Sequence, residues 1–154
     1  MTTRRRAREV ALQLLYEDDL NQDRDAEVSK KFLHARLLGN RPLVRFADTL
    51  VTGVIAHRWD IDKSLSAKAA NWSLRRMAAI DRNILRMGAY EILHGTTPGR
   101  VAINEAIELA KRYGSRQSGQ FVNGVLDQIL QDHESAQADK QSEQTQLAAE
   151  TDAI

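Results

Sequence analysis

The chain has 154 residues, of which 42% are hydrophobic and only 5% aromatic, and its formal net charge is +1. This length is enough for one domain with a hydrophobic core. The absence of cysteine excludes disulfide bonds, thiolate metal sites and cysteine nucleophiles, and it fits a reducing compartment. No apolar run is long enough for a secretory signal or a transmembrane helix, so we expect a cytoplasmic protein that makes no membrane contact.

Apolar side chains recur at intervals of three and four residues in seven segments, which is the spacing of an amphipathic helix. The stripes run from Ala7 to Leu15, over about residues 25–38, from Leu43 to Val54, from Ile61 to Ala69, over about residues 81–93, from Ala102 to Tyr113, and from Val122 to Leu130. No segment shows the strict alternation of a strand. The sequence therefore predicts an all-α protein.

Residues that cap or break helices stand between these segments. Thr2 or Thr3 can cap the first helix, and a break is expected at residues 71–73. Asp81 is predicted to be the N-cap of the fifth helix. The turns are short, which favours packing of neighbouring helices against one another. We expect a compact bundle of about seven helices, arranged as two three-helix subdomains that share one core.

Charge is distributed unevenly along the chain. Residues 132–154 hold six acidic residues and one lysine, whereas residues 1–131 hold 21 basic and 15 acidic residues. The last segment is rich in glutamine, alanine and serine, and it has too few large aliphatic side chains to offset the entropy lost on ordering. We therefore expect a basic domain over residues 1–131, suited to an anionic partner, followed by an acidic disordered tail over residues 132–154.

The sequence contains no motif for catalysis or metal binding. Its four histidines stand in four different segments without the close spacing of metal ligands, and glycine-rich phosphate loops are missing. Glu105 and Glu108 lie one helical turn apart, but Glu108 is also placed to pair with Arg112. This spacing favours a solvated helix face over acid–base chemistry. We expect no enzymatic activity, no cofactor and no metal site.

The stretch RRRAR places four arginines at the start of the first helix, namely Arg4, Arg5, Arg6 and Arg8. A helix N-terminus carries partial positive charge, so each arginine there is unfavourable by about 0.3–1 kcal/mol. Free backbone N–H groups and guanidinium groups together make a donor cluster suited to phosphate. The side chains fan around the helix axis, which argues against a membrane-facing helix. We predict that they bind RNA or DNA; the alternative is a solvated charge run.

A second candidate site lies in the segment GSRQSGQFVNG, which opens the last helix. Phe121 is one residue off the buried stripe, where its ring could stack on an unpaired base. Gln117 and its polar neighbours offer hydrogen-bonding groups of the kind that read base edges in single-stranded RNA. The alternative is that Phe121 packs at the edge of the core.

Three segments have residue patterns specific enough to compare with a known family: RRRAREVALQLLYE, DRNILRMGAYEIL and VAINEAIELAKRYGSRQSGQFVNGVLD. They resemble the NusB family of bacterial transcription antitermination factors, over about residues 4–131. The resemblance implies two three-helix subdomains with a linking helix, and no enzymatic activity. It also implies binding to the boxA segment of nascent ribosomal-RNA transcripts together with NusE, a small-subunit ribosomal protein. Other Nus factors and RNA polymerase would be partners in the assembled complex.

The resemblance also implies roles for particular residues. The arginine-rich first helix meets RNA, which assigns RNA contacts to Arg4, Arg5, Arg6 and Arg8. The start of the last helix does so too, which assigns RNA contacts to Gln117 and Phe121. The position that matches Gln117 is acidic in the enterobacterial form, so the neutral amide here should repel phosphate less. Asp81 matches an acidic contact to NusE, a role that competes with its predicted capping role.

Two other functions fit parts of the sequence. The same fold precedes the catalytic domain of ribosomal-RNA cytosine methyltransferases, although such an enzyme would need several hundred further residues. A pure protein-interaction bundle, with RRRAR binding an acidic protein, is the other alternative. RNA binding in the presence and absence of NusE distinguishes these functions from the antitermination factor.

Overall fold

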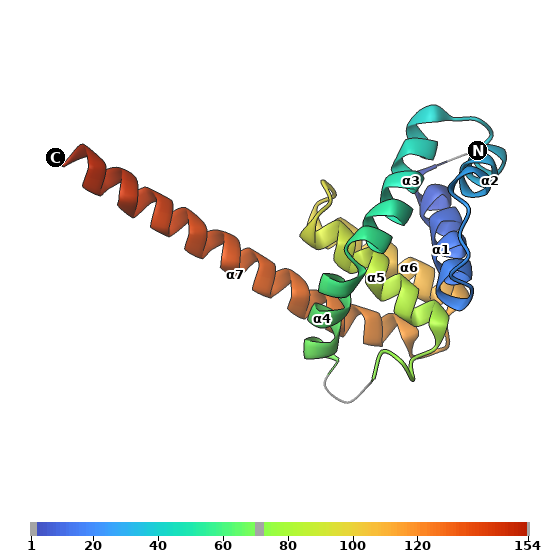
Figure 1. Ribbon diagram of the computed structural model, residues 1–154. Helices are drawn as coiled ribbons and strands as arrows, with labels where there is room; N and C mark the ends of the chain where they lie inside the picture. The colour runs from blue at the N-terminus through green and yellow to red at the C-terminus, as the bar shows by residue number, and fades with distance from the viewer. Residues whose placement is uncertain (1–2, 70–72, 154) are drawn as a thin grey trace.

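A computed structural model describes residues 3–69 and 73–153, and within them it contains seven α-helices and no strand, which confirms the all-α prediction (Figure 1). The helices are α1 (Arg4–Leu20), α2 (Ala26–Arg36), α3 (Arg41–Ala56), α4 (Arg58–Lys68), α5 (Ala79–Leu93), α6 (Gly99–Tyr113) and α7 (Ser118–Asp152). Thr2 and most of the predicted break at residues 71–73 lie outside the described residues.

Helices α1, α2 and α3 pack together as one three-helix unit. Each begins with a polar cap: the side chains of Thr3, Asp25 and Asn40 accept hydrogen bonds from backbone N–H groups in the following turn. The apolar stripe of α1 is buried, as its spacing predicts, and so is most of the stripe of α3. The first three-helix unit is therefore built as local sequence indicates.

Helices α5, α6 and α7 form the second three-helix unit, and α4 links the two units by contacts with α3, α5 and α7. Helix α5 is central, since residues 83–92 are all buried and five other helices pack against it. Buried hydrophobic residues from all seven helices make one continuous core. The expected arrangement of two subdomains around one core is confirmed.

Two glycines allow neighbouring helices to approach α5 closely. A Cβ atom on Gly53 of α3 would overlap the ring of Tyr90, and a Cβ on Gly88 would lie 2.6 Å from Leu126 Cδ1 of α7. A larger residue at either position would push a helix away from the centre of the bundle. The first three turns of α7, which follow Gln117 and carry Phe121 at their start, are thus held firmly against α5.

Helix α7 continues well beyond the body and ends far from the N-terminus (Figure 1). The structure here differs from the expected disordered tail, because residues 132–152 are helical. This segment contains no glycine or proline and is rich in alanine, glutamine and glutamate, which favour helix without tertiary contacts. Almost all of its side chains are exposed, and Lys68 pairs with Asp132 where the helix leaves the body. No helix among the described residues is long and apolar enough to cross a membrane.

Candidate nucleic-acid interface

The four arginines of α1 that are predicted to bind RNA contact different neighbours in the structure. Thr3 Oγ1 accepts a hydrogen bond from Arg6 N at 3.2 Å, and the first turn contains no acidic residue that would offset the positive end of the helix. The side chains of Arg5, Arg6 and Arg8 nevertheless find carboxylate partners elsewhere in the structure. These partners decide which arginines remain available to an anion.

Arg8 is a core residue. Its Nε and Nη2 donate to the two carboxylate oxygens of Glu91 at 2.8 and 3.1 Å, and the exposed fractions of the two side chains are 6% and 3%. The guanidinium group also lies 5.0 Å from the ring centroid of Phe46. This side chain neutralises a buried carboxylate of α5 and is only 6% exposed, so the predicted RNA contact of Arg8 stays a prediction that the ion pair does not favour.

Arg5 and Arg6 form ion pairs at the surface. Arg5 donates from Nε and Nη2 to Glu105 of α6, both at 3.1 Å, while its side chain is 57% exposed. Arg6 lies 3.1 Å from Glu9, which Arg112 also contacts at 2.7 Å. Exposed ion pairs contribute about 0–1 kcal/mol. A phosphate group can therefore displace or share Glu105 at little cost. Glu9 is buried, with its side chain 6% exposed, but its contact with Arg112 would remain if Arg6 turned to a phosphate.

Arg4 is the one arginine of the four that is exposed and has no carboxylate partner among the described residues. Its guanidinium carbon lies 4.5 Å from the centroid of the Phe46 ring on α3, and it forms no ion pair with any described residue. The cation–π contact orients the side chain without neutralising its charge. The available positive charge at the start of α1 is thus centred on Arg4, with Arg5 and Arg6 as exchangeable contributors.

The start of α7 lines a cavity of about 500 Å³. Its walls are Arg76, Met77, Ala78, Asp81, Ser115, Gln117, Ser118, Gln120 and Phe121. Phe121 is partly buried against the core and presents the rest of its ring to the cavity. The Oγ of Ser118 accepts a hydrogen bond from Ser115 N at 2.8 Å, which fixes the turn that leads into the helix. Gln117, Phe121 and Asp81 therefore belong to one site.

Asp81 does not cap α5. The helix begins two residues earlier, at Ala79, with Ala78 in the cap position and no side-chain hydrogen bond there. Asp81 instead lies inside the first turn, where its charge is favourable to the helix dipole. Its Oδ1 is buried and accepts no hydrogen bond from the described residues. The predicted capping role is therefore wrong, and the carboxylate is left available to a donor outside the chain.

A groove of about 510 Å³ connects the two ends of the site. It is lined by Arg6, Glu9, Leu12, Gln13, Tyr16, Ala78, Ala79, Ile80 and Tyr113, and it shares Ala78 with the cavity at α7. Tyr16 and Tyr113 are about two-fifths exposed, at 38% and 41%. Sequence reasoning missed both tyrosines and Arg76. The only available signals were Tyr16, which lies off its apolar stripe, Tyr113 at the very end of its stripe, and two consecutive arginines, Arg75 and Arg76.

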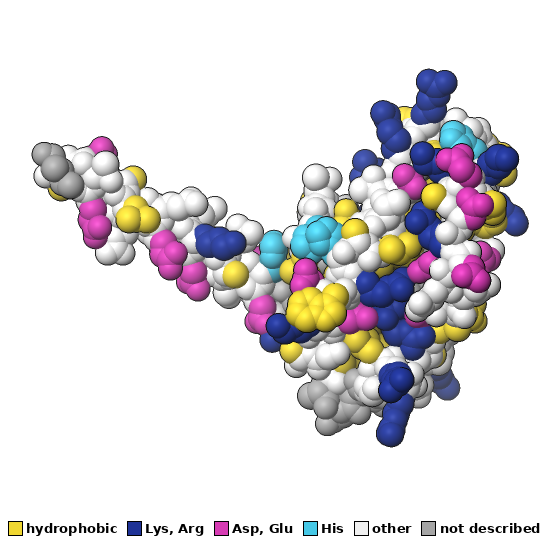
Figure 2. Space-filling model, in the orientation of Figure 1, with side chains coloured by type: hydrophobic (Ala, Val, Ile, Leu, Met, Phe, Trp, Pro, Cys, Tyr) yellow, Lys and Arg dark blue, Asp and Glu magenta, His cyan; other side chains and the backbone are white. Residues whose placement is uncertain are grey.

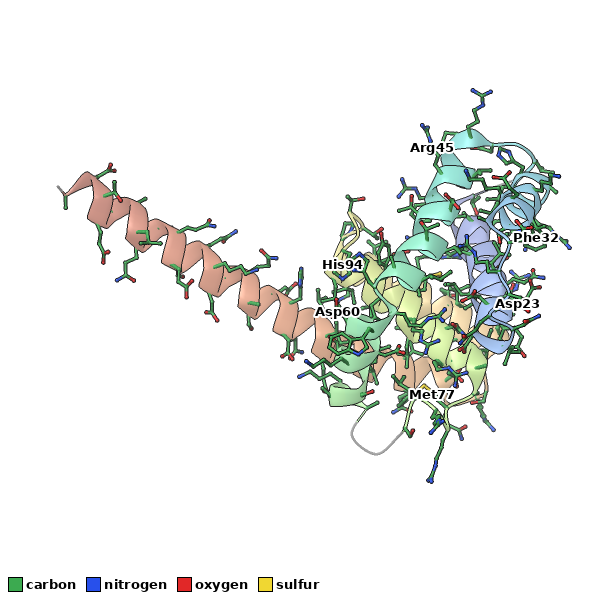
Figure 3. All side chains as sticks on the ribbon, viewed as in Figure 1. Asp23, Phe32, Arg45, Asp60, Met77 and His94 are labelled. Atoms are coloured by element: carbon green, nitrogen blue, oxygen red, sulfur yellow. The ribbon has the colours of Figure 1, made fainter. Side chains whose placement is uncertain are left out.

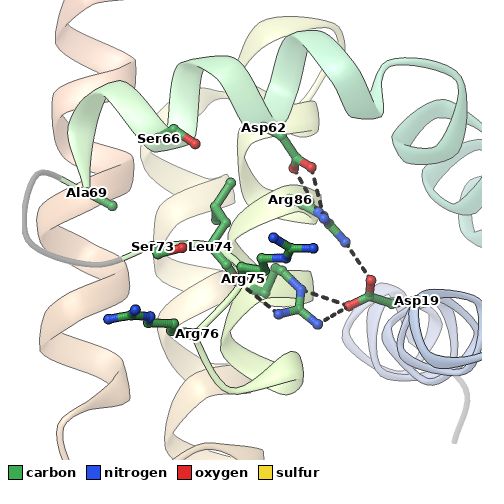
Figure 4. A pocket seen from close by; sticks show the side chains of 10 residues that line it. Asp19, Asp62, Ser66, Ala69, Ser73, Leu74, Arg75, Arg76 and Arg86 are labelled. Carbon is green, nitrogen blue, oxygen red and sulfur yellow. Dashed lines mark hydrogen bonds and ion pairs between the residues drawn. The ribbon is translucent and has the colours of Figure 1, made fainter.

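A chain of ion pairs holds the loop that carries Arg76 (Figure 4). Asp19 of α1 accepts two hydrogen bonds from Arg82 at 2.6 and 2.8 Å, and Arg82 also donates to the carbonyl oxygens of Leu74 and Met77. Arg86 lies 3.2 Å from Asp19, close enough for an ion pair but not aligned for a hydrogen bond. The loop before α5 is therefore tied to α1.

The charges around Asp19 change its pKa. Burial would raise the pKa of this carboxyl, but hydrogen bonds from Arg82 and Asn83 and the positive charge of Arg86 outweigh burial and lower it. Arg86 also donates to both oxygens of Asp62 on α4, at 2.8 and 2.9 Å. Asp19, Asp62, Arg82 and Arg86 line a cavity of about 1080 Å³ to which Arg75 and Arg76 also contribute (Figure 4).

Histidine and carboxylate side chains do not form a metal centre in the described part of the chain. The rings of His57 and His94 stack with their centroids 4.0 Å apart, so their nitrogen lone pairs do not converge on one point. Glu105, one of the two carboxylates considered for acid–base chemistry, pairs with Arg5. The candidate interface thus offers arginines, tyrosines, amides, one phenylalanine and the carboxylate of Asp81.

The sequence of this chain is similar to that of proteins of known family. Residues 5–131 match the NusB family. The chain is 46% identical over 130 residues to the transcription antitermination protein NusB of Anaeromyxobacter dehalogenans, covering 84% of this chain and 92% of that protein.

Comparison with solved structures also points to the NusB family. NusB of T. maritima is 36% identical, with a TM-score of 0.76 and coverage of 86% of this chain and 94% of that one. A structure of the antitermination factors NusB and NusE in complex with double-stranded RNA is 28% identical, with a TM-score of 0.75 and coverage of 84% and 96%. The match spans both three-helix units and stops where α7 leaves the body. This chain belongs to the NusB family.

Proposed function

We propose that this protein is a transcription antitermination factor that binds boxA-type sequence in nascent ribosomal-RNA transcripts together with NusE. In this role it supports processive transcription by RNA polymerase, alongside other Nus factors in the cytoplasm. The function requires binding surfaces rather than a catalytic centre. Its named relatives are transcription antitermination proteins.

One observation carries the proposal: the cavity at the start of α7 and the arginines at the start of α1 lie on a continuous surface. The groove that contains Arg6 and the cavity that contains Phe121 meet at Ala78. An RNA strand on this surface would meet exchangeable guanidinium groups at one end and an aromatic ring at the other. The first supplies phosphate contacts, and the second supplies base contacts.

The cavity favours an unpaired base over a base pair. Phe121 can stack only on a base whose face is free, which in a continuous duplex is covered by neighbouring pairs. Gln117 and Gln120 flank the ring with amide donors and acceptors. Arg76 lies on the same wall and forms no ion pair with any described residue, so it can contact the phosphate next to the stacked base. We therefore propose single-stranded RNA as the ligand at α7.

We propose that the apolar floor of the groove between Arg6 and Ala78 binds a protein, while the RNA strand follows its rim from Arg6 to the α7 cavity. Leu12, Ile80 and the exposed parts of Tyr16 and Tyr113 give it an apolar floor. Asp81, beside it, offers a buried carboxylate oxygen without an internal donor. A backbone N–H or a basic side chain of NusE would satisfy that oxygen. NusE and RNA would then meet around Ala78, which explains why the two partners act together.

Titration of a labelled boxA-like RNA against a scrambled oligomer tests the function. The measurement is repeated with NusE present, and a hairpin of the same composition tests the preference for unpaired bases. We expect tighter binding to the boxA-like strand, a further gain with NusE, and weaker binding to the hairpin. Equal affinity for both strands, unaltered by NusE, would reject this function in favour of a protein-interaction bundle or a general ribosomal-RNA binder.

A further inference from the structure

Four exposed arginines on three helices gather at the end of the first three-helix unit where α1 and α3 begin and α2 ends. They are Arg4, Arg36, Arg41 and Arg45, and we call them the helix-end cluster. Basic side chains crowd this end of the molecule in Figure 2, and Arg45 projects away from the body in Figure 3. Within the described residues, none of the four pairs with a carboxylate.

One tertiary contact and one tight turn assemble the cluster. The Arg4 guanidinium lies over Phe46 of α3, which joins the start of α1 to the second turn of α3. Leu38 and Gly39 adopt positive φ angles of 54° and 68°, and Gly39 N donates to His34 O at 2.8 Å. This tight turn separates Arg36, the last residue of α2, from Arg41, the first residue of α3, by only four residues.

The electrostatics of α3 are unfavourable without an anion. Arg41 is its first residue, Arg45 follows one turn later, and no acidic residue lies in the first turn. Like charges four residues apart on a helix repel each other, and both arginines lie near the positive end of the helix dipole. The one carboxylate of α3, on Asp48, forms no ion pair with them in the described structure. Helix α2 shows the opposite pattern, since Asp25 and Glu27 occupy its start.

We propose that the helix-end cluster binds the sugar–phosphate backbone of RNA that flanks the segment held at the α7 cavity. The proposal rests on the RNA-binding function above. Arg4 adjoins Arg5 and Arg6 on α1, so a strand that reaches the start of α1 continues naturally onto α3. None of the cluster lines the cavity or the groove described above. The cluster therefore adds charge and hydrogen bonds to phosphate and does not select bases.

The test compares a short boxA-like RNA with the same RNA extended by ten unrelated nucleotides at its 5′ or its 3′ end. The test variant is Arg41→Gln/Arg45→Gln, and Arg45→Gln alone should show half its effect. The control, Lys63→Gln/Lys140→Gln, removes the same charge from exposed positions on α4 and α7. Affinity is measured at several salt concentrations, and thermal unfolding confirms that all proteins fold.

We expect one of the extensions to tighten binding to the wild type and to the control. The test variant should lose that gain, and its dependence of log affinity on log salt should be shallower by about 0.7 for each lost contact, or ~1.4 for two. Its affinity for the short RNA should stay within about twofold of the wild type.

Three outcomes would overturn the proposal. If the wild type binds the short RNA but neither extension helps, or if the test variant keeps the gain, the cluster does not contact RNA and the α7 site stands. If the test variant keeps the gain from the extension but binds NusE more weakly in a parallel titration, the cluster is a protein-docking surface. If the wild type binds no RNA at all, the proposed function fails together with this inference.

Discussion

Arg8 and Glu91 lie 83 residues apart in sequence and form a buried ion pair, with two hydrogen bonds of 2.8 and 3.1 Å that join α1 to α5. This pair places a charge from the arginine-rich start of the chain inside the core. It separates Arg8 from its three neighbours in RRRAR, which lie at or near the surface.

Replacing Arg8 with alanine should lower the free energy of unfolding by about 3–5 kcal/mol, because Glu91 would remain buried without a partner. Urea unfolding measures the change. Arg4→Ala is the matched control and should alter stability by less than about 0.5 kcal/mol. Equal stability of the Arg8 variant and the wild type would show that the pair contributes nothing to the fold.

Replacing Arg5 with glutamine should make RNA binding less sensitive to salt and leave stability nearly unchanged. In the ion pair with Glu105 the arginine side chain is exposed. Loss of this pair should therefore lower the free energy of unfolding by at most about 1 kcal/mol. Glu105→Gln frees Arg5 and should slightly strengthen RNA binding. Filter binding or fluorescence anisotropy at four salt concentrations reports both effects. A Glu105→Gln variant that binds RNA more weakly would contradict the competition between carboxylate and phosphate.

Phe121→Ala should weaken binding of single-stranded RNA by about 1–3 kcal/mol, the contribution of one stacked base. Phe121→Leu serves as control for the fold, since leucine retains apolar contact with the core but cannot stack. Both variants should bind RNA poorly, while the leucine variant should unfold near the wild-type temperature. Wild-type affinity in the leucine variant would remove base stacking from the mechanism.

Gln117→Glu should reduce RNA affinity, because the new carboxylate would face phosphate in the α7 cavity. Gln128→Glu adds the same charge to an exposed position further along α7 and should leave affinity unchanged. Isothermal titration at low salt, where electrostatic effects are largest, compares the two. A similar affinity in both variants would place Gln117 outside the contact surface.

The ionisation of Asp19 should make the free energy of unfolding depend on pH. Its pKa in the folded protein is lowered by Arg82, Asn83 and Arg86 in spite of burial. The stabilisation is therefore complete above the unfolded pKa of about 3.9 and is lost as pH falls through the lower folded value. Urea unfolding from pH 6 to pH 2 should show the gap between wild type and Asp19→Asn closing below about pH 4. The exposed control Asp23→Asn should show no comparable gap at pH 6.

The helices could be predicted from sequence because each buries one stripe, and a stripe is visible as spacing. Helix α5 is the exception, since it is buried on all sides and carries polar residues such as Arg86 and Glu91 inside the core. Its start was misplaced for a related reason. Asp81 has the chemistry of a cap, but the carbonyl groups of Leu74 and Met77 are satisfied by Arg82, which holds the chain in position to begin the helix at Ala79.

The candidate site was only partly predictable. The spacing of apolar residues shows that Phe121 lies off the buried stripe, and the run of arginines is visible in the sequence itself. Which arginine is free depends on partners such as Glu91 and Glu105, which lie far away in sequence and become neighbours only in the fold. For the same reason, the sequence does not predict that Arg41 and Arg45 cluster with Arg4, because the packing of α3 against α1 brings them to one end of the molecule.

The projecting part of α7 changes the charge that a nucleic acid experiences. At 1.5 Å per residue, the helix beyond residue 131 extends about 30 Å from the body. Ionic screening at physiological strength acts over about 8 Å. Most of the carboxylates on this extension are therefore electrostatically remote from a strand bound at α1. Such a strand responds to the cationic body as if the molecule were much more basic than its net charge of +1 indicates.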